Sequence, residues 1–463
     1  MTTTLHARRG NAARRRSAAT TACAVLVAAC LTAPAAAQMG FGFGGQAVGG
    51  ISVDAHGIVR NLEPEASREL AEKRRELLAR PERPDGRPAA LRKVSLGRLC
   101  AAVDACAAKG EPLPPDVLLL GGLERITHVF VDPNGHDIVL AGPADTAAVD
   151  ASGTVVAAAS GRPLLHLEDL VVALRAIDGA RSAGVQCSID PSPEGVAKLQ
   201  RYLAGLKTMG ANPEATLRTM ESVLGPQRVT IAGVPAESRI ARVLVAADYR
   251  MKRIGMGLEP AGIEGLPSYL AMVPAGSTSG AMLPRFWLEA DYDPLARDPD
   301  ELAWEIGARR MKCLTESDLA TRDGPARGKA AADKIAGAWC ALMTEHYADL
   351  ARRQPVFAEL VNCVDLAVVA ALIRGRQLDR RAGLDLAPLT DATRLAVPAY
   401  DAPATLSTVA TGFKKGSRWI VSASGGVQFQ PWAFATNTTE SAGSAATRAA
   451  ALAGRPVEGW RWD

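Results

Sequence analysis

Five histidines follow residue 37, and their spacing is the first guide to the chemistry that this chain can support. No two of them stand four residues apart, and no His-Glu-x-x-His pattern occurs, so a zinc site on one helix is not indicated. His128 and His136 flank a predicted hairpin turn and could share one ion, but surface or turn histidines are the favoured reading. We therefore expect no metal and no other cofactor. The five are His56, His128, His136, His166 and His346.

Acidic residues near His166 and near residue 293 are the remaining candidates for acid–base catalysis. Glu168 and Asp169 stand at the start of a predicted helix, where carboxylates more often stabilise the helix dipole. The acidic segment Asp291–Glu301 lacks the alternating oxygen ligands and the glycine of a calcium loop, which favours a solvated turn. If the protein is a hydrolase with a non-local site, the residues to examine are His128, His166, Asp169 and Asp293.

Nucleophile and nucleotide motifs are incomplete in this sequence. Gly276–Gly280 carries Thr278 where the G-x-S-x-G pattern requires serine. Gly324–Ala330 is one residue short of a phosphate loop and lacks its hydroxyl residue. The glycines of Met39–Gly50 have the dinucleotide-binding spacing, but the strand and helix that this motif requires are missing. These failures favour a binding or scaffolding protein over an enzyme.

Cysteine usage permits disulfides without specifying them. Six cysteines follow residue 37, namely Cys100, Cys106, Cys187, Cys313, Cys340 and Cys363. Cys100 and Cys106 are too far apart along one predicted helix to be bridged. Cys340 and Cys363 lie on two predicted helices joined near Pro355 and are a candidate disulfide pair. If the helices pack antiparallel, the two cysteines would lie at different heights along them, because they are at unequal distances in sequence from Pro355. Unpaired buried thiols are the alternative for most of the six.

The first 37 residues read as a secretory signal peptide. Arg14, Arg15 and Arg16 precede a short apolar run, and Ala35–Ala37 offers a cleavage site after Ala37. The alternative is a lipoprotein signal ending at Cys30, which would then be lipidated. We expect a periplasmic or secreted protein, which would be anchored to the cell envelope if Cys30 is lipidated. No later run is long enough to predict a transmembrane segment.

Charge argues against a nucleic-acid partner. The leader holds five arginines and no acid, so removing it leaves 53 − 5 = 48 basic against 49 acidic residues. A nearly neutral body provides no general attraction for phosphates. A protein or another component of the cell envelope is the partner that we expect.

Local patterns predict an α+β fold, a mixed body with short antiparallel hairpins and two or three subdomains. Expected helices include 63–80, 95–109, 167–177, 192–206 and 240–254, and a C-terminal helical pair at 330–353 and 356–374. Expected strands include 126–131 and 137–141, joined by an Asn-Gly turn, and 185–189, 228–234, 286–292, 302–306, 311–315 and 419–434. The last 25 or so residues are expected to fray.

Domain limits follow from composition. We expect a leader with a charged helix at 38–90, an α/β domain at 91–212, a second at 213–380 and a β segment with its tail at 381–463. In the predicted helix 240–254, apolar residues recur at three- and four-residue steps. Arg239, Arg242, Arg250 and Arg253 lie off that face, so a solvated or partner-binding basic face is expected.

Several stretches resemble a family of exported planctomycete proteins defined only as domain of unknown function 1598. They include ITHVFVDP, GRPLLHLEDLVVALRAI, CSIDPSPEGVAKL, the long segment from Val229 to Glu259, RFWLEADYDPL and SGGVQFQPWAF. The resemblance implies an exported, mixed α/β protein and assigns no catalytic residue. Together with the motif search, it favours an exported, non-enzymatic binding or scaffolding protein. An exported hydrolase and a surface lipoprotein are the alternatives, and the ligand, oligomeric state and disulfide pattern stay open.

Overall fold

The computed structural model describes residues 47–79, 87–206, 212–274, 283–307, 309–315, 319–321, 324–326, 334–412 and 419–463. Every described residue belongs to one compact unit within Met39–Asp463. The predicted signal peptide, its cleavage site after Ala37 and the predicted lipidation site Cys30 lie outside the described residues.

The predicted α+β class is confirmed, because two large sheets alternate with many helices. The eight-stranded sheet has the order β1 (Ile51–Val53), β2 (Ile58–Asn61), β16 (Thr405–Leu406), β9 (Gln227–Ala232), β8 (Val185–Pro191), β19 (Ser424–Phe429), β10 (Arg285–Tyr292) and β13 (Arg309–Thr315). The seven-stranded sheet has the order β20 (Thr438–Glu440), β11 (Leu295–Arg297), β12 (Ala303–Glu305), β4 (His128–Asp132), β5 (Asp137–Ala144), β3 (Ala89–Ser95) and β21 (Arg461–Trp462). Three short pairs are β6 (Ala147–Val149) with β7 (Val155–Ala157), β14 (Leu319–Thr321) with β15 (Gly324–Ala326), and β17 (Thr411–Gly412) with β18 (Trp419–Ile420).

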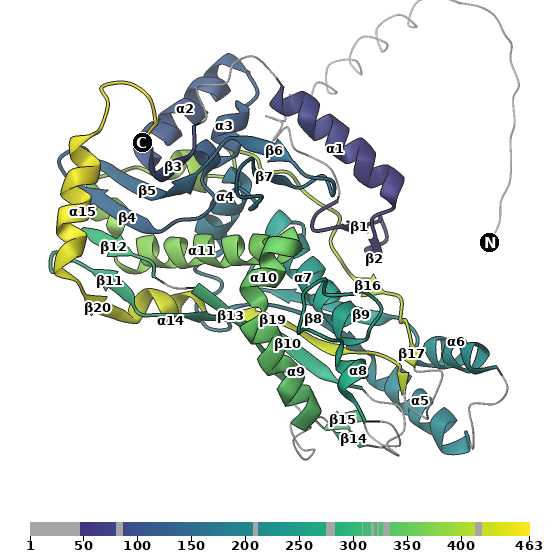
Figure 1. Ribbon diagram of the computed structural model, residues 1–463. Coiled ribbons are helices and arrows are strands. Elements are labelled where there is room, and N and C mark those ends of the chain that lie inside the picture. Colours follow the sequence, from purple (N-terminus) through teal and green to yellow (C-terminus); the bar gives the residue numbers. More distant parts are fainter. Residues whose placement is uncertain are drawn as a thin grey trace, which may run out of the picture. The chain divides into compact units, whose positions relative to one another are not determined.

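Helices cover and separate these sheets (Figure 1). The first half of the chain contributes α1 (Pro64–Leu78), α2 (Leu96–Lys109), α3 (Pro115–Leu118), the 3-10 turn η1 (Leu120–Gly122), α4 (Leu167–Ala176), α5 (Pro193–Gly205) and α6 (Pro213–Leu224). The second half contributes α7 (Arg239–Gly255), α8 (Tyr269–Met272), α9 (Lys334–Glu345), α10 (Tyr347–Arg353), α11 (Pro355–Gly375), α12 (Leu378–Ala382), α13 (Ala387–Thr390), α14 (Pro431–Thr436) and α15 (Ala442–Ala453).

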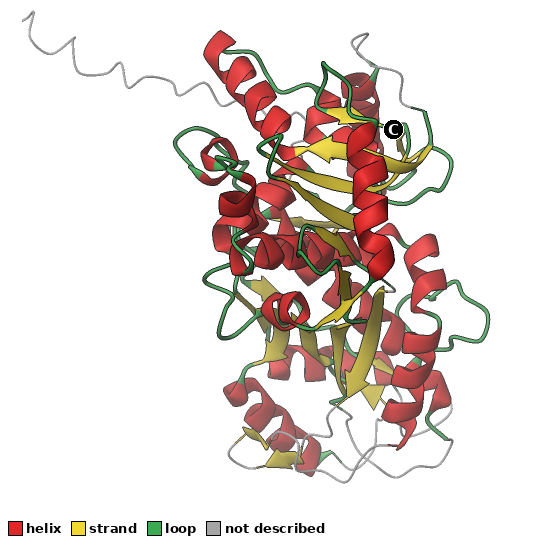
Figure 2. Cartoon of the chain, turned by 90° about the vertical axis from the view of Figure 1, so that its left-hand side faces the viewer, coloured by secondary structure: helices red, strands yellow, loops and turns green. Residues whose placement is uncertain are grey.

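Helix α11 runs between the two sheets and is the most apolar helix that the structure describes (Figures 1 and 2). Its length and composition would let it cross a membrane, but 89% of its most apolar stretch is buried inside the protein. It packs against α4, α7, α10, α12 and α14. A helix that is apolar all round is expected in such a surrounded position.

Helix α7 lies on the eight-stranded sheet and is tied to it by a buried lysine. Lys252 Nζ donates to the carbonyl oxygens of Ile189 on β8 (2.9 Å) and Gly425 on β19 (3.1 Å). Its third partner is the Asp248 carboxylate one turn earlier, at 2.8 Å. All three donors of the buried ammonium group are therefore satisfied, as a charge removed from water requires.

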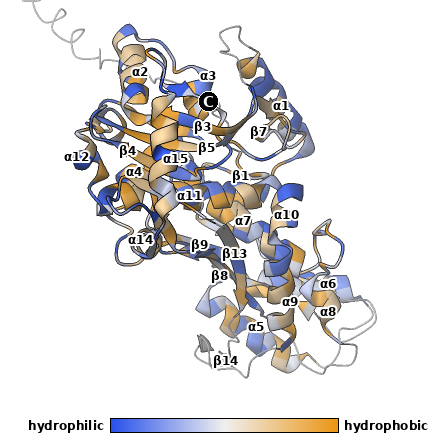
Figure 3. Ribbon diagram, turned by 60° about the vertical axis from the view of Figure 1, so that its left-hand side comes forward, coloured by the Kyte–Doolittle hydropathy of each residue, from blue (hydrophilic) through white to orange (hydrophobic). Residues whose placement is uncertain are grey.

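Elements with strong local signals are confirmed. Ser95 caps α2 and Gly110 ends it in a left-handed conformation, and Ser192 caps α5 with Pro193 at its first position. The predicted hairpin is β4–β5, in which Asp132 is paired with Asp137 around the Asn-Gly turn. Figure 3 shows mainly hydrophilic colours on α1, the predicted charged helix, which buries only Ala71 and Leu78.

Three sequence predictions are wrong in detail. The predicted helix 330–353 is two helices that break at His346. The predicted strand 419–434 ends at Phe429, because Pro431 occupies the first turn of α14. The tail expected to fray forms α15, which packs on β12, since a run of alanines strongly favours helix.

Both large sheets combine strands from several of the predicted domains. The eight-stranded sheet takes β8 from 91–212, β9 from 213–380, β19 from 381–463 and β1 from 38–90. The limits at residues 91, 213 and 381 stay predictions, but β3 spans the first limit, β8 pairs with β9 across the second, and β9 pairs with β16 across the third.

Candidate functional site

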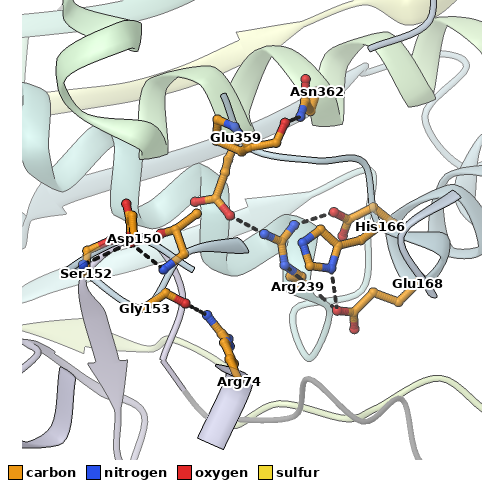
Figure 4. Close-up of polar contacts among 12 residues, drawn as sticks. Arg74, Asp150, Ser152, Gly153, His166, Glu168, Arg239, Glu359 and Asn362 are labelled. Atoms are coloured by element: carbon orange, nitrogen blue, oxygen red, sulfur yellow. Dashed lines mark hydrogen bonds and ion pairs between the residues drawn. The ribbon is translucent and has the colours of Figure 1, made fainter. Parts of the chain in front are cut away.

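Three helices that are distant in the sequence place charged residues around one point in the interior. Glu168 and Asp169 lie in the first turn of α4, Arg239 is the first residue of α7, and Glu359 lies near the start of α11 (Figure 4). Two of these starts have a local cause. Ser238 caps α7 through the backbone N–H of Ala241, and Pro355 begins α11.

The Arg239 guanidinium is the centre of this cluster. It donates to the carboxylates of Asp169 and Glu359, and its Nε lies 3.8 Å from Glu168 Oε1. Only 6% of Arg239 is exposed. A cation at a helix N-terminus is opposed by the helix dipole, and a buried cation without partners is very costly. The three carboxylates therefore make the burial of Arg239 tolerable.

Two further groups surround Glu168. The hydroxyl of Tyr400 donates to the Glu168 carboxylate, with oxygen–oxygen distances of 3.1 and 3.2 Å. His166 Nδ1 lies 3.8 Å from Glu168 Oε1. Arg74 reaches in from α1 and donates to the carbonyl oxygen of Gly153 at 2.6 Å, close enough to the cluster to influence its charges. We call His166, Glu168, Asp169, Arg239, Glu359 and Tyr400 the Arg239 cluster.

Burial dominates the electrostatics of the Arg239 cluster. It raises the pKa of Glu168 to about 7, assisted by the neighbouring Asp169 charge and opposed by Arg239. Burial also raises the pKa values of Asp169 and Glu359, again against the effect of Arg239. The pKa of His166 is lowered well below its usual value by burial and then by the positive charges of Arg239 and Arg74. At neutral pH, His166 is therefore uncharged, and Glu168 keeps its proton to a higher pH than an exposed glutamate does.

This arrangement has perturbed acid–base groups but no activated nucleophile among the described residues. Cys363, the neighbouring thiol on α11, has its pKa raised well above the usual value by burial and then by the Asp169 charge, so the thiol stays protonated. A reactive cysteine requires the opposite shift. The cluster residues are all buried. The geometry is that of an ionic joint between α4, α7 and α11.

The structure brings together only two of the four residues expected for a hydrolase. His166 and Asp169 belong to the Arg239 cluster, whereas His128 lies on β4, stacked on Phe130 with its Nδ1 2.9 Å from Thr127 Oγ1. Asp293 is exposed in the turn between β10 and β11. His128 pairs with Ala141, at the other end of the hairpin from the turn that holds His136. A separation of four residue pairs, roughly 13 Å, rules out the shared ion.

The expectation of a solvated basic face on α7 is wrong. Arg239 and Arg242 are buried, and Arg242 donates to the carbonyl oxygen of Asp401. Arg250 and Arg253 are half-buried and both bind the Glu259 carboxylate. Helices and strands surround α7, so its polar face is buried as well. The sequence holds one signal, because Glu359 and Asp365 lie in a largely apolar helix and a buried acid requires a partner.

The acidic segment Asp291–Glu301 is a structural turn, and it is not fully solvated as predicted. Asp298 is buried and accepts the backbone N–H groups of Leu302 (2.7 Å) and Ala303 (2.9 Å). Glu301 pairs with Arg376 and Arg381 of the α11–α12 region. These carboxylates hold the turn and the helix ends together.

The cysteine arrangement differs from the expected pair. Cys340 and Cys363 are free thiols, and Cys363 lies beside the Arg239 cluster. Cys340 Sγ lies 3.5 Å from Cys313 Sγ instead. The two helices carry these thiols to different neighbours because α9 packs on β13, whereas α11 packs on α4 and α7.

A cavity of about 470 Å³ lies beside α11, and Ala358, Val361 and Asn362 are the residues of this helix that line it. Its walls are α9, α10 and α11, β13 and two loops that precede β4 and α4. Asn362, three residues after Glu359, faces the cavity and donates to the carbonyl oxygen of Pro163 at 3.0 Å. The lining residues are Glu124, Arg125, Arg162, Pro163, Met311, Thr344, Glu345, Tyr347, Ala348, Ala351, Arg352, Ala358, Val361 and Asn362. We call this the α10 pocket.

Comparison with known proteins gives one match. Residues 187–269 match a protein family of unknown function (DUF1598). The match runs from β8 through α7 and so includes Arg239 and the Asp248–Lys252 pair. No curated protein and no solved structure matches the chain. We call residues 187–269 the DUF1598 segment. The structure shows that the acidic partners of Arg239 lie outside this segment, in α4 and α11.

Replacing Arg239 by methionine should destabilise the protein by about 3–5 kcal/mol. The substitution leaves three carboxylates buried without their central cation. The free energy of unfolding, measured by urea titration of tryptophan fluorescence, checks this. The control is Arg218→Met in α6 of the same DUF1598 segment, where an exposed ion pair with Glu214 is lost at a cost below about 1 kcal/mol. Equal effects of the two substitutions would contradict a central role for Arg239.

The contribution of Glu168 to the stability of the protein should fall as the pH rises from about 4.5 towards about 7, whereas His166, whose pKa burial lowers, contributes in the opposite direction. The unfolded state loses the Glu168 proton near pH 4.5, whereas the folded state holds it to about 7, so the folded state binds more protons in this window. Asp248, whose pKa burial also raises to about 7, acts in the same direction. Glu168→Gln should flatten the profile by up to roughly 3 kcal/mol. Urea titrations at several pH values measure this, and a profile as steep as that of the exposed control Glu194→Gln would contradict it.

Proposed function

We propose that this protein is an exported, non-enzymatic binding protein that holds a small acidic molecule in the α10 pocket. The observation that carries the proposal is the pocket itself. Its volume of about 470 Å³ is typical of cavities that enclose small organic molecules. Its lining combines an apolar surface with a few charged groups, which is the usual composition of a ligand site.

The apolar part of the pocket comes mainly from the helices. Ala348 and Ala351 of α10 and Ala358 and Val361 of α11 contribute small side chains that leave room for a ligand. Met311 adds a flexible thioether from the edge strand β13. An apolar ligand body of modest size would lie against these residues.

The charged part of the pocket favours an anion. The lining includes three arginines, Arg125, Arg162 and Arg352, and two glutamates, Glu124 and Glu345, and Arg352 is paired with Asp349. The Glu124 carboxylate is engaged by the Ser160 hydroxyl at 2.9 Å. Arg162 forms no ion pair with any residue that the structure describes, so its guanidinium is available to a carboxylate or sulfonate.

A hydrolase with the four predicted residues is supported less well. His166 and Asp169 have the perturbed pKa values of catalytic groups, but their side chains are sealed inside the protein and do not line the α10 pocket. Structural ion pairs perturb pKa values in the same way. Binding without catalysis therefore accounts for both features, with the Arg239 cluster as support and the pocket as site.

An anionic aromatic probe tests the pocket. Anilinonaphthalene sulfonate should bind the folded wild-type chain saturably, and Arg162→Ala should weaken binding about tenfold through loss of one charged contact. Ala351→Trp should abolish binding by filling the cavity. Fluorescence titration gives the affinities. Arg201→Ala, an exposed arginine on α5, is the control and should bind as the wild type does. Unchanged binding by both pocket variants would exclude this site.

The export part of the proposal rests on the leader, and mass spectrometry of the mature protein tests it. A chain that begins at Gln38 supports signal cleavage after Ala37, and a chain that begins at a lipidated Cys30 supports the alternative, a surface lipoprotein. The control is a chain with Arg14, Arg15 and Arg16 replaced by glutamine, which should accumulate uncleaved. A wild-type chain still beginning at Met1 would contradict export.

A further inference from the structure

Strand β13 and helix α9 bring two thiols together in the interior. Cys313 Sγ and Cys340 Sγ lie 3.5 Å apart, and Met251 Sδ lies 4.0 Å from Cys313 Sγ. Each cysteine is only 4% exposed. A disulfide requires a sulfur–sulfur distance of about 2.05 Å, so small rotations of the two side chains would suffice to close this gap.

The backbones of the two cysteines are held together by a single hydroxyl group. Thr344 Oγ1 accepts the backbone N–H of Cys313 at 2.9 Å and donates to the carbonyl oxygen of Cys340 at 2.8 Å. The Cys313 nitrogen and the Cys340 carbonyl oxygen are therefore at most about 6 Å apart. The shared hydroxyl therefore holds the two backbones close to one another, as a disulfide, whose Cα atoms are at most about 7 Å apart, requires.

We propose that Cys313 and Cys340 form a disulfide bond that fastens α9 to β13. The inference rests on the proposed export, since such bonds persist in oxidising compartments. The bond forms by thiol–disulfide exchange with an oxidised dithiol or glutathione. One thiolate attacks the donor disulfide and releases one thiol, and the second thiolate displaces the other. Two protons leave the cysteines, and the donor takes up two electrons.

Closure takes place while the chain folds, because the folded protein shields both sulfurs. Burial, together with the neighbouring Cys340, raises the pKa of Cys313 well above its usual value, so the folded thiol is a poor nucleophile. The bond also bears on the proposed ligand site. Met311 stands two residues before Cys313, Thr344 stands four after Cys340, and both line the α10 pocket. The bond therefore fixes one wall of that pocket.

Refolding the chain from residue 38 with and without oxidised glutathione tests the bond. After denaturation, free thiols are alkylated and the peptides are mapped by mass spectrometry without reduction. We expect a cross-linked peptide containing Cys313 and Cys340, lighter by two hydrogens, with the other four cysteines alkylated. The midpoint of thermal unfolding should be higher for the oxidised protein than for the reduced one. Six alkylated cysteines, or a cross-link between other residues, would overturn the proposal.

Two variants separate this pair from the alternatives. Cys363→Ser should retain both the cross-link and the oxidation-dependent stabilisation, which excludes the pairing of Cys340 with Cys363. Cys313→Ser with Cys340→Ser should unfold at the same temperature under both conditions. An oxidation-dependent shift that survives in the double variant would also overturn the proposal. Since glutathione is the oxidant in this experiment, the result does not depend on whether the mature N-terminus confirms export.

Discussion

The burial of Arg239 is the constraint on which the interior depends. A guanidinium removed from water needs several carboxylate oxygens in fixed positions, and α4 and α11 supply them. The starts of three helices are thereby located relative to one another. The same α7 helix uses Lys252 to bind the backbone of β8 and β19. One helix thus joins the helical layer to the eight-stranded sheet through two buried cations.

Local elements could be predicted from the sequence because their signals are local. Ser95 and Gly110 delimit α2, Ser192 and Pro193 begin α5, and the Asn-Gly turn defines the β4–β5 hairpin. The errors arose where a neighbour far along the chain decides the outcome. Arg239 looked solvated because Glu359 lies 120 residues away in sequence. The break at His346 likewise follows from packing, since both sides of it are helical by pattern.

The candidate site illustrates the same limit. His166 and Asp169 were singled out from their residue types, and the structure places them together, but as members of an ionic joint. The α10 pocket carries no motif, because residues from five separate segments line it and most of them are alanines, arginines or apolar residues. The match of residues 187–269 includes none of the residues that line the pocket. The pocket is recognised by its shape, and no short sequence motif encodes that shape.

The placement of the acids around Arg239 also limits how the polypeptide can acquire its structure during synthesis. The first two partners emerge before the arginine, but Glu359 emerges long after it. Until α11 has been synthesised, Arg239 at the start of α7 lacks its partner Glu359. The segment from β8 to α7 therefore cannot reach its final structure alone, because the last partner of Arg239 lies on a helix that is synthesised later.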